Sequence, residues 1–233
     1  MCPLDVTPPC RRERASMRLY VRVPAPSAVK VEIFAIERGG APLEIVDTAQ
    51  LARDQILRMN PLGTVPILEI APGCFISESL TICQFLDEVN EGRPLFGNTP
   101  DERAQIAMWE RRAELRLLIP SLEYVHHTHP AFAGHWRQHP EWARDEAAKS
   151  IAMLELIAER LESSLFLAGD SLSAADLTAY LGYRGLRAFG AVGQIESVGF
   201  RRWEREVGER PSMGPLRQLT GALEQAPRAG QAG

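Results

Sequence analysis

The sequence predicts an α/β unit followed by an all-helical unit. Up to about residue 90, short strand-like and helix-like segments alternate, whereas beyond residue 100 apolar residues recur almost throughout at helical spacing. Between the two units lies Gly92–Pro100, whose glycines and prolines are typical of a linker. We therefore expect domains at residues 17–92 and 100–225, with disordered tails at 1–16 and 226–233.

The first half of the α/β unit is predicted to run strand, helix, strand and helix. In the first helix Val31, Phe34 and Ile36 form the apolar set. Gly39-Gly40 can end this helix because glycine readily adopts the left-handed conformation at a helix end. The expected elements are strands at 18–23 and 43–46 and helices at 28–38 and 51–59.

The second half of this unit is predicted to be a hairpin and a helix. Ala71-Pro72-Gly73 is a turn signal between two β-rich runs at 67–70 and 74–76. Pro66 should open the first of these strands rather than lie inside it, because proline has no N–H to donate within a sheet. The last helix should begin at about Ser79, after which apolar residues return at helical spacing.

Val65-Pro66 could present backbone groups to an extended ligand. If the bond between them is cis, the N–H and C=O of Val65 turn outward and can pair with a peptide as an added strand does. An X–Pro bond is cis in about 5–6% of folded cases, so the sequence alone does not decide the isomer. The alternative is that Pro66 only marks the edge of the sheet.

Glu78-Ser79 form a second motif at the expected start of the last helix of the α/β unit. A helix N-terminus offers free N–H groups and the positive end of its dipole to a carboxylate, and the Ser79 hydroxyl is a further donor. Glu78 can accept a hydrogen bond from an ammonium group. The pair suits the head group of a free α-amino acid, although Ser79 could also be a simple helix cap.

Together, Asn60–Leu68 (NPLGTVPIL) and Glu78–Glu88 (ESLTICQFLDE) resemble the glutathione site of the glutathione S-transferase family. The resemblance extends over most of the chain, from about Met17 to about Gln225. It implies a thioredoxin-like N-terminal domain, an all-helical bundle as C-terminal domain, and glutathione as the co-substrate. It also implies a homodimer in which the thioredoxin-like domain of one chain meets residues 101–118 of the other.

The resemblance also assigns roles to single residues. Val65 would hold the cysteinyl backbone of glutathione, Pro66 would be cis, and Glu78 and Ser79 would hold the γ-glutamyl end. The implied activity is detoxification, in which the glutathione thiolate attacks a small, hydrophobic electrophile and an alkyl or aryl group is transferred. Alternatives are a catalytically weak glutathione-binding ligand carrier or partner-docking module, and a glutathione-dependent isomerase.

The group that would stabilise the thiolate is missing from its usual place. A free thiol has a pKa near 8.5, and one hydrogen bond to the anion is worth about 1.5–3 kcal/mol, or roughly one to two pKa units. An ungapped alignment places Ala25 where bacterial relatives carry a Ser, Thr or Cys donor, and Arg22 near the tyrosine of other classes. Tyr20 lies two residues before that position. Ser27 is the candidate catalytic donor, through its hydroxyl, its N–H or both, and the alternative is that it only caps a helix. The charge of Arg22 could also lower the thiol pKa, and the alternative is that Arg22 is a solvated residue at the end of a strand.

The helical unit is expected to contain four helices, at 101–124, 141–164, 174–189 and 213–225. Ser173 and Asp176 form a variant capping box at the start of the third, and Leu172 can pack on Leu177 as a hydrophobic staple. Glutathione transferases carry this box at the corresponding place. Its predicted role is structural.

The five histidines lie within fourteen residues of the helical unit, at His126, His127, His129, His135 and His139. Clustered imidazoles raise a metal hypothesis, but the accompanying Pro130, Gly134 and Pro140 predict a loop, and we expect no metal. In the transferases this region borders the pocket for the electrophile. The candidate pocket residues are Tyr124, and Trp109 and Arg112 from the preceding helix, although helical spacing explains the last two equally well as core residues.

The composition excludes several other classes of protein. A net charge of −4 argues against binding to nucleic acid, and no apolar run approaches the roughly 20 residues that span a bilayer. We expect a cytoplasmic protein without a membrane partner. The cysteines show neither a C-x-x-C motif nor zinc-like spacing, which favours a reducing compartment, and Cys74 and Cys83 fall in apolar segments expected in the core.

Overall fold

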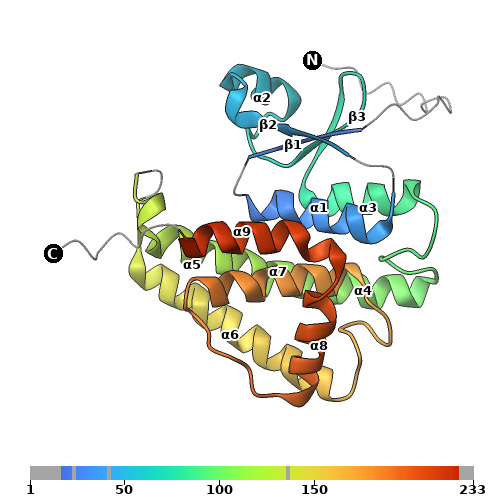
Figure 1. The fold of residues 1–233 in the computed structure, drawn as a ribbon, viewed down its shortest axis with the longest axis vertical. Coiled ribbons are helices and arrows are strands. Elements are labelled where there is room, and N and C mark those ends of the chain that lie inside the picture. The colour runs from blue at the N-terminus through green and yellow to red at the C-terminus, as the bar shows by residue number, and fades with distance from the viewer. Residues whose placement is uncertain (1–16, 23–24, 41–42, 135–136, 226–233) are drawn as a thin grey trace.

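The computed structural model describes residues 17–22, 25–40, 43–134 and 137–225. The predicted tails lie outside these ranges, as do Cys2, Cys10 and His135. Figure 1 shows a small α/β domain on top of a larger helical domain, with two helices lying between the sheet and the helical domain. The α/β domain consists of β1 (Arg18–Val21), α1 (Pro26–Arg38), β2 (Glu44–Asp47), α2 (Arg53–Met59), β3 (Ile67–Ala71), β4 (Cys74–Ser77) and α3 (Ser79–Val89).

The sheet has the strand order β2-β1-β3-β4. β1 runs parallel to β2 and antiparallel to β3, and Leu19 of β1 lies opposite Ile45 of β2 and Leu68 of β3. Leu19 and Leu68 are fully buried beneath the helices. This mixed sheet, with α1 and α3 on one side and α2 toward the other (Figure 1), confirms the predicted thioredoxin-like domain.

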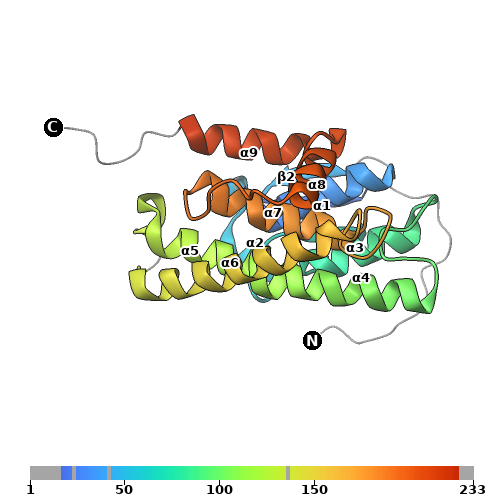
Figure 2. The same ribbon diagram turned by 90° about the horizontal axis from the view of Figure 1, so that it is seen from below.

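The helical domain is built around α7. Figure 2 shows α7 between α9 on one side and α4 and α5 on the other, and α7 packs against all three. Buried side chains run along nearly its whole length. The elements of this domain are α4 (Pro100–Ala113), the π-helical segment η2 (Glu114–Leu118), α5 (Ile119–Thr128), η3 (Pro130–Phe132), α6 (Pro140–Glu162), α7 (Ala174–Ala188), α8 (Val198–Gly208), η4 (Pro211–Met213) and α9 (Gly214–Gln225).

Two helical predictions need correction. The first predicted helix continues through the π-helical segment to Thr128, so His126 and His127 belong to a helix and not to a loop. The helix α8 was not predicted at all. Its signal was the spacing of Phe200, Trp203 and Val207, all fully buried, after an N-cap at Ser197 whose hydroxyl oxygen accepts from the N–H of Phe200.

Two single-residue predictions about the core also need correction. Cys83 is buried on α3, but Cys74 is exposed on the edge strand β4, where one face of the strand meets solvent. Ile36 was placed in the apolar set of α1, yet 50% of it is exposed. The buried face of α1 is formed instead by residues that include Val31, Ile33 and Phe34.

The linker between the domains is held by a buried ion pair. Arg38 Nε, at the end of α1, lies 2.7 Å from Asp87 Oδ1 on α3. The Asp87 carboxylate also accepts from the N–H groups of Leu95 (2.8 Å) and Phe96 (3.0 Å). Arg38 in turn donates to backbone carbonyls that include that of Arg93. The chain therefore leaves the α/β domain in a fixed direction.

Candidate functional site

A cavity of about 300 Å³ lies where the N-terminal ends of α1 and α3 meet the loop before β3. Its lining contains five residues that the sequence singled out, which are Ser27, Val65, Pro66, Glu78 and Ser79. Leu62 and Thr64 complete the lining and were not predicted, although both lie inside the NPLGTVPIL motif. The structure therefore brings both motifs and Ser27 to one cavity.

The loop before β3 is organised by a buried asparagine. The side-chain amide of Asn60 donates to the carbonyl and the hydroxyl oxygen of Thr64, each at 2.9 Å. Its side-chain oxygen accepts from the N–H of Leu62 at 3.2 Å. The loop ends in a cis bond between Val65 and Pro66. In the described parts of the chain neither the N–H nor the C=O of Val65 has a hydrogen-bond partner, so both are available to a ligand.

Glu78 joins β4 to α3 in an unusual backbone conformation. Its φ angle is +70°, a region that residues other than glycine rarely adopt. Such outliers concentrate at functional sites. Glu78 is the N-cap residue, and its carbonyl accepts from Ile82 N–H at 2.9 Å. The alternative that Ser79 caps α3 is therefore wrong, because Ser79 is the first helical residue and its hydroxyl has no partner among the described residues.

Ser27 occupies the second position of α1. The N-cap residue is Ala25, whose carbonyl accepts from Ala28 and Val29, so the alternative that Ser27 caps the helix is also wrong. Neither the hydroxyl nor the N–H of Ser27 bonds to another described residue. Ala25 does not line the cavity. The position aligned with the usual donor is thus both apolar and outside the cavity, whereas Ser27 is polar and inside it.

The two other groups considered near the thiol do not reach the cavity. The Tyr20 hydroxyl donates to Glu69 Oε2 at 2.9 Å. Burial and the neighbouring Glu69 carboxylate raise the pKa of Tyr20, which makes it a poorer acid. Arg22 is exposed beyond the end of β1 and does not line the cavity.

Comparison with known proteins agrees with this geometry. The family model for the glutathione S-transferase N-terminal domain matches residues 26–89, a range that includes every residue lining the cavity. Glutathione S-transferase 2 of Saccharomyces cerevisiae is 31% identical over 173 residues, which cover 72% of each chain. The chain belongs to the glutathione S-transferase family. Glutathione transfer is the general activity that this membership supports.

Two further relatives of this transferase bear on its fold and chemistry. The crystal structure of a glutathione S-transferase domain-containing protein from Marinobacter aquaeolei superimposes with a TM-score of 0.77 at 30% identity, covering 84% of this chain and 99% of the other. Maleylacetoacetate isomerase of Dictyostelium discoideum is 30% identical over 171 residues, which cover 71% of this chain and 72% of the isomerase.

The residues predicted for the electrophile pocket of the transferase do not line the cavity. Trp109 is buried in the core, with 6% of its surface exposed. The Arg112 guanidinium lies over the Trp109 ring at 5.1 Å from its centroid, so these two side chains pack on each other. Tyr124 is half-buried on α5. Their role toward an electrophile stays a prediction.

His126 and His129 hold the end of α5 to its neighbours. His126 and Phe132 form an edge contact with centroids 4.9 Å apart, and His129 contacts Phe189 of the α7 C-terminus at 5.1 Å. His127 Nε2 lies 3.4 Å from a Glu123 carboxylate oxygen. Burial lowers the pKa of His126.

Among the described residues no group of three or more His, Cys, Asp or Glu side chains could hold a metal ion, and the expectation of no metal stays a prediction. Within the same residues, every helix is too short or too polar to span a bilayer.

Proposed function

We propose that this transferase conjugates glutathione to small hydrophobic electrophiles, and that glutathione binds in the cavity lined by Ser27, Val65, Glu78 and Ser79. One observation carries the proposal. The hydroxyl groups of the two serines, the Glu78 carboxylate and the Val65 peptide group all border one cavity, and none of them is paired within the described chain. Polar groups left unpaired in this way are available to a polar ligand.

The proposed binding mode follows from the chemistry of each group. The Val65 N–H and C=O pair with the cysteinyl part of glutathione as a neighbouring strand would. The γ-glutamyl carboxylate lies at the N-terminus of α3, where it accepts from free N–H groups and from the Ser79 hydroxyl. The Glu78 carboxylate accepts from the γ-glutamyl ammonium. The sulfur then lies toward Ser27.

In the proposed mechanism Ser27 stabilises the glutathione thiolate. A hydrogen bond from its hydroxyl or N–H, together with the positive end of the α1 dipole, favours the anion over the neutral thiol. One such bond, worth about 1.5–3 kcal/mol, lowers the thiol pKa by roughly one to two units. The thiolate attacks the electrophilic carbon, a C–S bond forms, and the leaving group departs with its electron pair. We place the electrophile toward the helical domain, with Tyr124, Trp109 and Arg112 as candidate pocket residues.

The binding site is tested by calorimetric titration with glutathione. Replacing Glu78→Gln together with Ser79→Ala should weaken binding at least about tenfold, the equivalent of one lost hydrogen bond to a charged group. Thr81→Ala is the matched control, because Thr81 is exposed on the same turn of α3 but does not line the cavity. Unchanged affinity in the double variant would exclude this site.

The chemical step is tested by titrating the bound thiol through its ultraviolet thiolate absorbance. The glutathione thiol bound to the parent protein should ionise well below pH 8.5. Ser27→Ala should slow conjugation about tenfold or more if the hydroxyl is the donor. Ala25→Ser should raise the rate only if position 25 still faces the sulfur. A bound thiol that titrates as free glutathione does, with both variants matching the parent, would favour the ligand-carrier alternative.

A glutathione-dependent isomerase is the second candidate function, supported by the similarity to maleylacetoacetate isomerase. An isomerase would use the same thiolate but regenerate glutathione. Loss of free thiol in proportion to product therefore distinguishes conjugation from isomerisation.

We further propose that the protein is cytoplasmic and forms a homodimer. Sedimentation at micromolar concentration should give about twice the mass of one chain. A single species at the monomer mass would contradict the dimer.

A further inference from the structure

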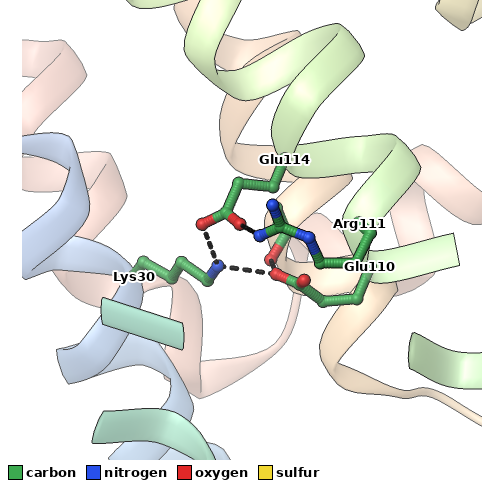
Figure 3. Close-up of polar contacts among 5 residues, drawn as sticks. Lys30, Glu110, Arg111 and Glu114 are labelled. Carbon is green, nitrogen blue, oxygen red and sulfur yellow. Dashed lines mark hydrogen bonds and ion pairs between the residues drawn. The ribbon is translucent and has the colours of Figure 1, made fainter. Parts of the chain in front are cut away.

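A buried ionic network connects α1 to the helical domain (Figure 3). Lys30 Nζ of α1 lies 2.7 Å from Glu110 Oε1 of α4 and 3.4 Å from Glu114 Oε1 at the start of the π-helical segment. The Lys30 and Glu110 side chains are only 3% and 1% exposed. Burial alone would lower the pKa of Lys30, but the two carboxylates outweigh it and raise that pKa, so the side chain is an ammonium at neutral pH.

The network includes two more side chains, one of them on α7. Thr178 of α7 donates to Glu110 Oε1 at 3.2 Å, and Arg111 pairs with the second oxygen of Glu114 (Figure 3). Glu114 begins the π-helical segment, a rare helical geometry that often occurs at functional sites. One lysine of the α/β domain is therefore held jointly by α4, the π-helical segment and, through Glu110, α7.

Lys30 lies one helical turn from the cavity along α1, and Cys83 lies one turn from it along α3. Ser27 and Lys30 are three residues apart on α1, and Ser79 and Cys83 are four apart on α3, so each pair shares a helix face. The Cys83 side chain is fully buried. Burial raises the pKa of this thiol to about 12, and the charges of Lys30, Glu110 and Glu114 also act on it.

The two ends of α1 are held differently. Its C-terminal turn carries Arg38, which pairs with Asp87, and Glu37, which pairs with Arg210 of the helical domain. Its N-terminal turn follows Ala25, an N-cap residue that makes no side-chain hydrogen bond. Among the described ion pairs, those of Lys30 are the nearest in sequence to this end. Together with the apolar packing of the same part of the helix, they can set where the first turn of α1 lies.

A buried ion pair is better suited to fixing geometry than to adding stability. Replacing both charged partners by uncharged groups of similar shape is often nearly neutral, whereas removing one partner strands a buried charge and is strongly destabilising. The ammonium of Lys30 thus has one favourable position, opposite Glu110 and Glu114. Any shift of the first turns of α1 would move it away from them.

We propose that Lys30 is a positioning residue for the transferase reaction, which sets the first turn of α1 so that Ser27 meets the glutathione sulfur. The inference rests on the proposed role of Ser27. It assigns no contact between Lys30 and glutathione. Loss of the network should therefore impair ionisation of the bound thiol while leaving the binding contacts of Val65, Glu78 and Ser79 in place.

The test compares Lys30→Met, the double variant Lys30→Met with Glu110→Gln, and Lys30→Arg. The double variant strands no charge on Glu110, and Glu114 keeps Arg111 as its partner, so it can fold where Lys30→Met alone does not. We expect the thiol pKa of bound glutathione to rise by about one unit and kcat to fall about tenfold. Glutathione affinity should stay within about threefold. Lys30→Arg, which keeps the charge, should give a thiol pKa and a kcat closer to those of the parent.

Glu37→Gln is the matched control. It removes a partly buried interdomain ion pair from the other end of the same helix, and should lower thermal stability without moving the thiol pKa. A folded double variant with the parental thiol pKa and kcat would overturn the inference, as would an equal shift in Glu37→Gln. A parent whose bound thiol titrates as free glutathione does would instead refute the proposed function.

Discussion

Replacing Asp176 should be among the most damaging single changes to the helical domain. This carboxylate, fully buried at the start of α7, accepts four hydrogen bonds. They come from Leu167 N–H (2.9 Å), Ser173 N–H (3.0 Å), the Ser173 hydroxyl (2.8 Å) and Trp203 Nε1 (2.9 Å). The predicted capping pair is thus the centre of a larger network that joins α7, α8 and the loop before α7.

The magnitude follows from the donors that Asp176→Ala would strand. Leu167 N–H, Ser173 N–H and Trp203 Nε1 are buried, and each unpaired buried donor costs about 1–3 kcal/mol. Three of them give about 3–9 kcal/mol, against a total unfolding free energy of about 5–15 kcal/mol for typical proteins. We expect a loss of at least about 4 kcal/mol, or failure to fold.

Urea unfolding followed by circular dichroism measures this loss, and two milder variants calibrate it. Ser173→Ala removes one of the four bonds and should cost on the order of 1 kcal/mol. Trp203→Phe removes the Nε1 donor and should fall between the two. If Asp176→Ala cost no more than Ser173→Ala, the argument from stranded donors would be refuted.

Two further predictions concern α1 and α7. Burial alone would raise the pKa of Glu37, but hydrogen bonds from Arg210 and a neighbouring serine outweigh it and lower that pKa. The stability that Glu37 contributes is therefore fully present above its unfolded-state pKa of about 4.3, and it is lost as pH falls through the lower folded-state pKa. Below about pH 4 the parent should therefore lose more stability than Glu37→Gln does. On α7, a Cβ at Gly182 would lie 3.0 Å from backbone atoms of Leu118, so Gly182→Ala should cost about 1–3 kcal/mol in unfolding free energy. Gly185→Ala, whose Cβ would meet its nearest neighbour at 3.6 Å, should be neutral or stabilising by up to about 1 kcal/mol. Equal effects of the two alanines would contradict the close approach of α7 to the π-helical segment.

The part of the site that sequence could predict is local in the chain. Val65-Pro66 and Glu78-Ser79 are neighbours whose positions follow from the start of β3 and the start of α3. Their residue types carry the constraint directly, because proline is confined to the start or edge of a strand and a serine hydroxyl at a helix N-terminus adds a donor to the free N–H groups there. The same local logic selected Ser27, although it lies two residues beyond the N-cap residue, Ala25.

The part that sequence could not predict depends on residues far apart in the chain. Lys30 and Glu110 are separated by 80 residues, and no periodicity in either helix reveals that one will bury its charge against the other. The exposure of Cys74 has the same origin, since it follows from β4 lying at the edge of the sheet. The spacing of apolar residues shows which face of an element is buried, but not which neighbouring element covers that face.

On the proposed mechanism, α1 is the element where catalysis and domain packing meet. Ser27 lies in its first turn, Lys30 one turn later, and Glu37 and Arg38 in its last turn. Lys30 and Glu37 pair with residues of the helical domain. Arg38 pairs with Asp87 of α3 and donates to the linker. A donor at position 25 would precede the helix, whereas a donor at position 27 is held by helical geometry itself. Sites built on helices are held more tightly than sites on loops. On this mechanism, a serine whose position the rest of α1 determines supplies the donor that Ala25 cannot.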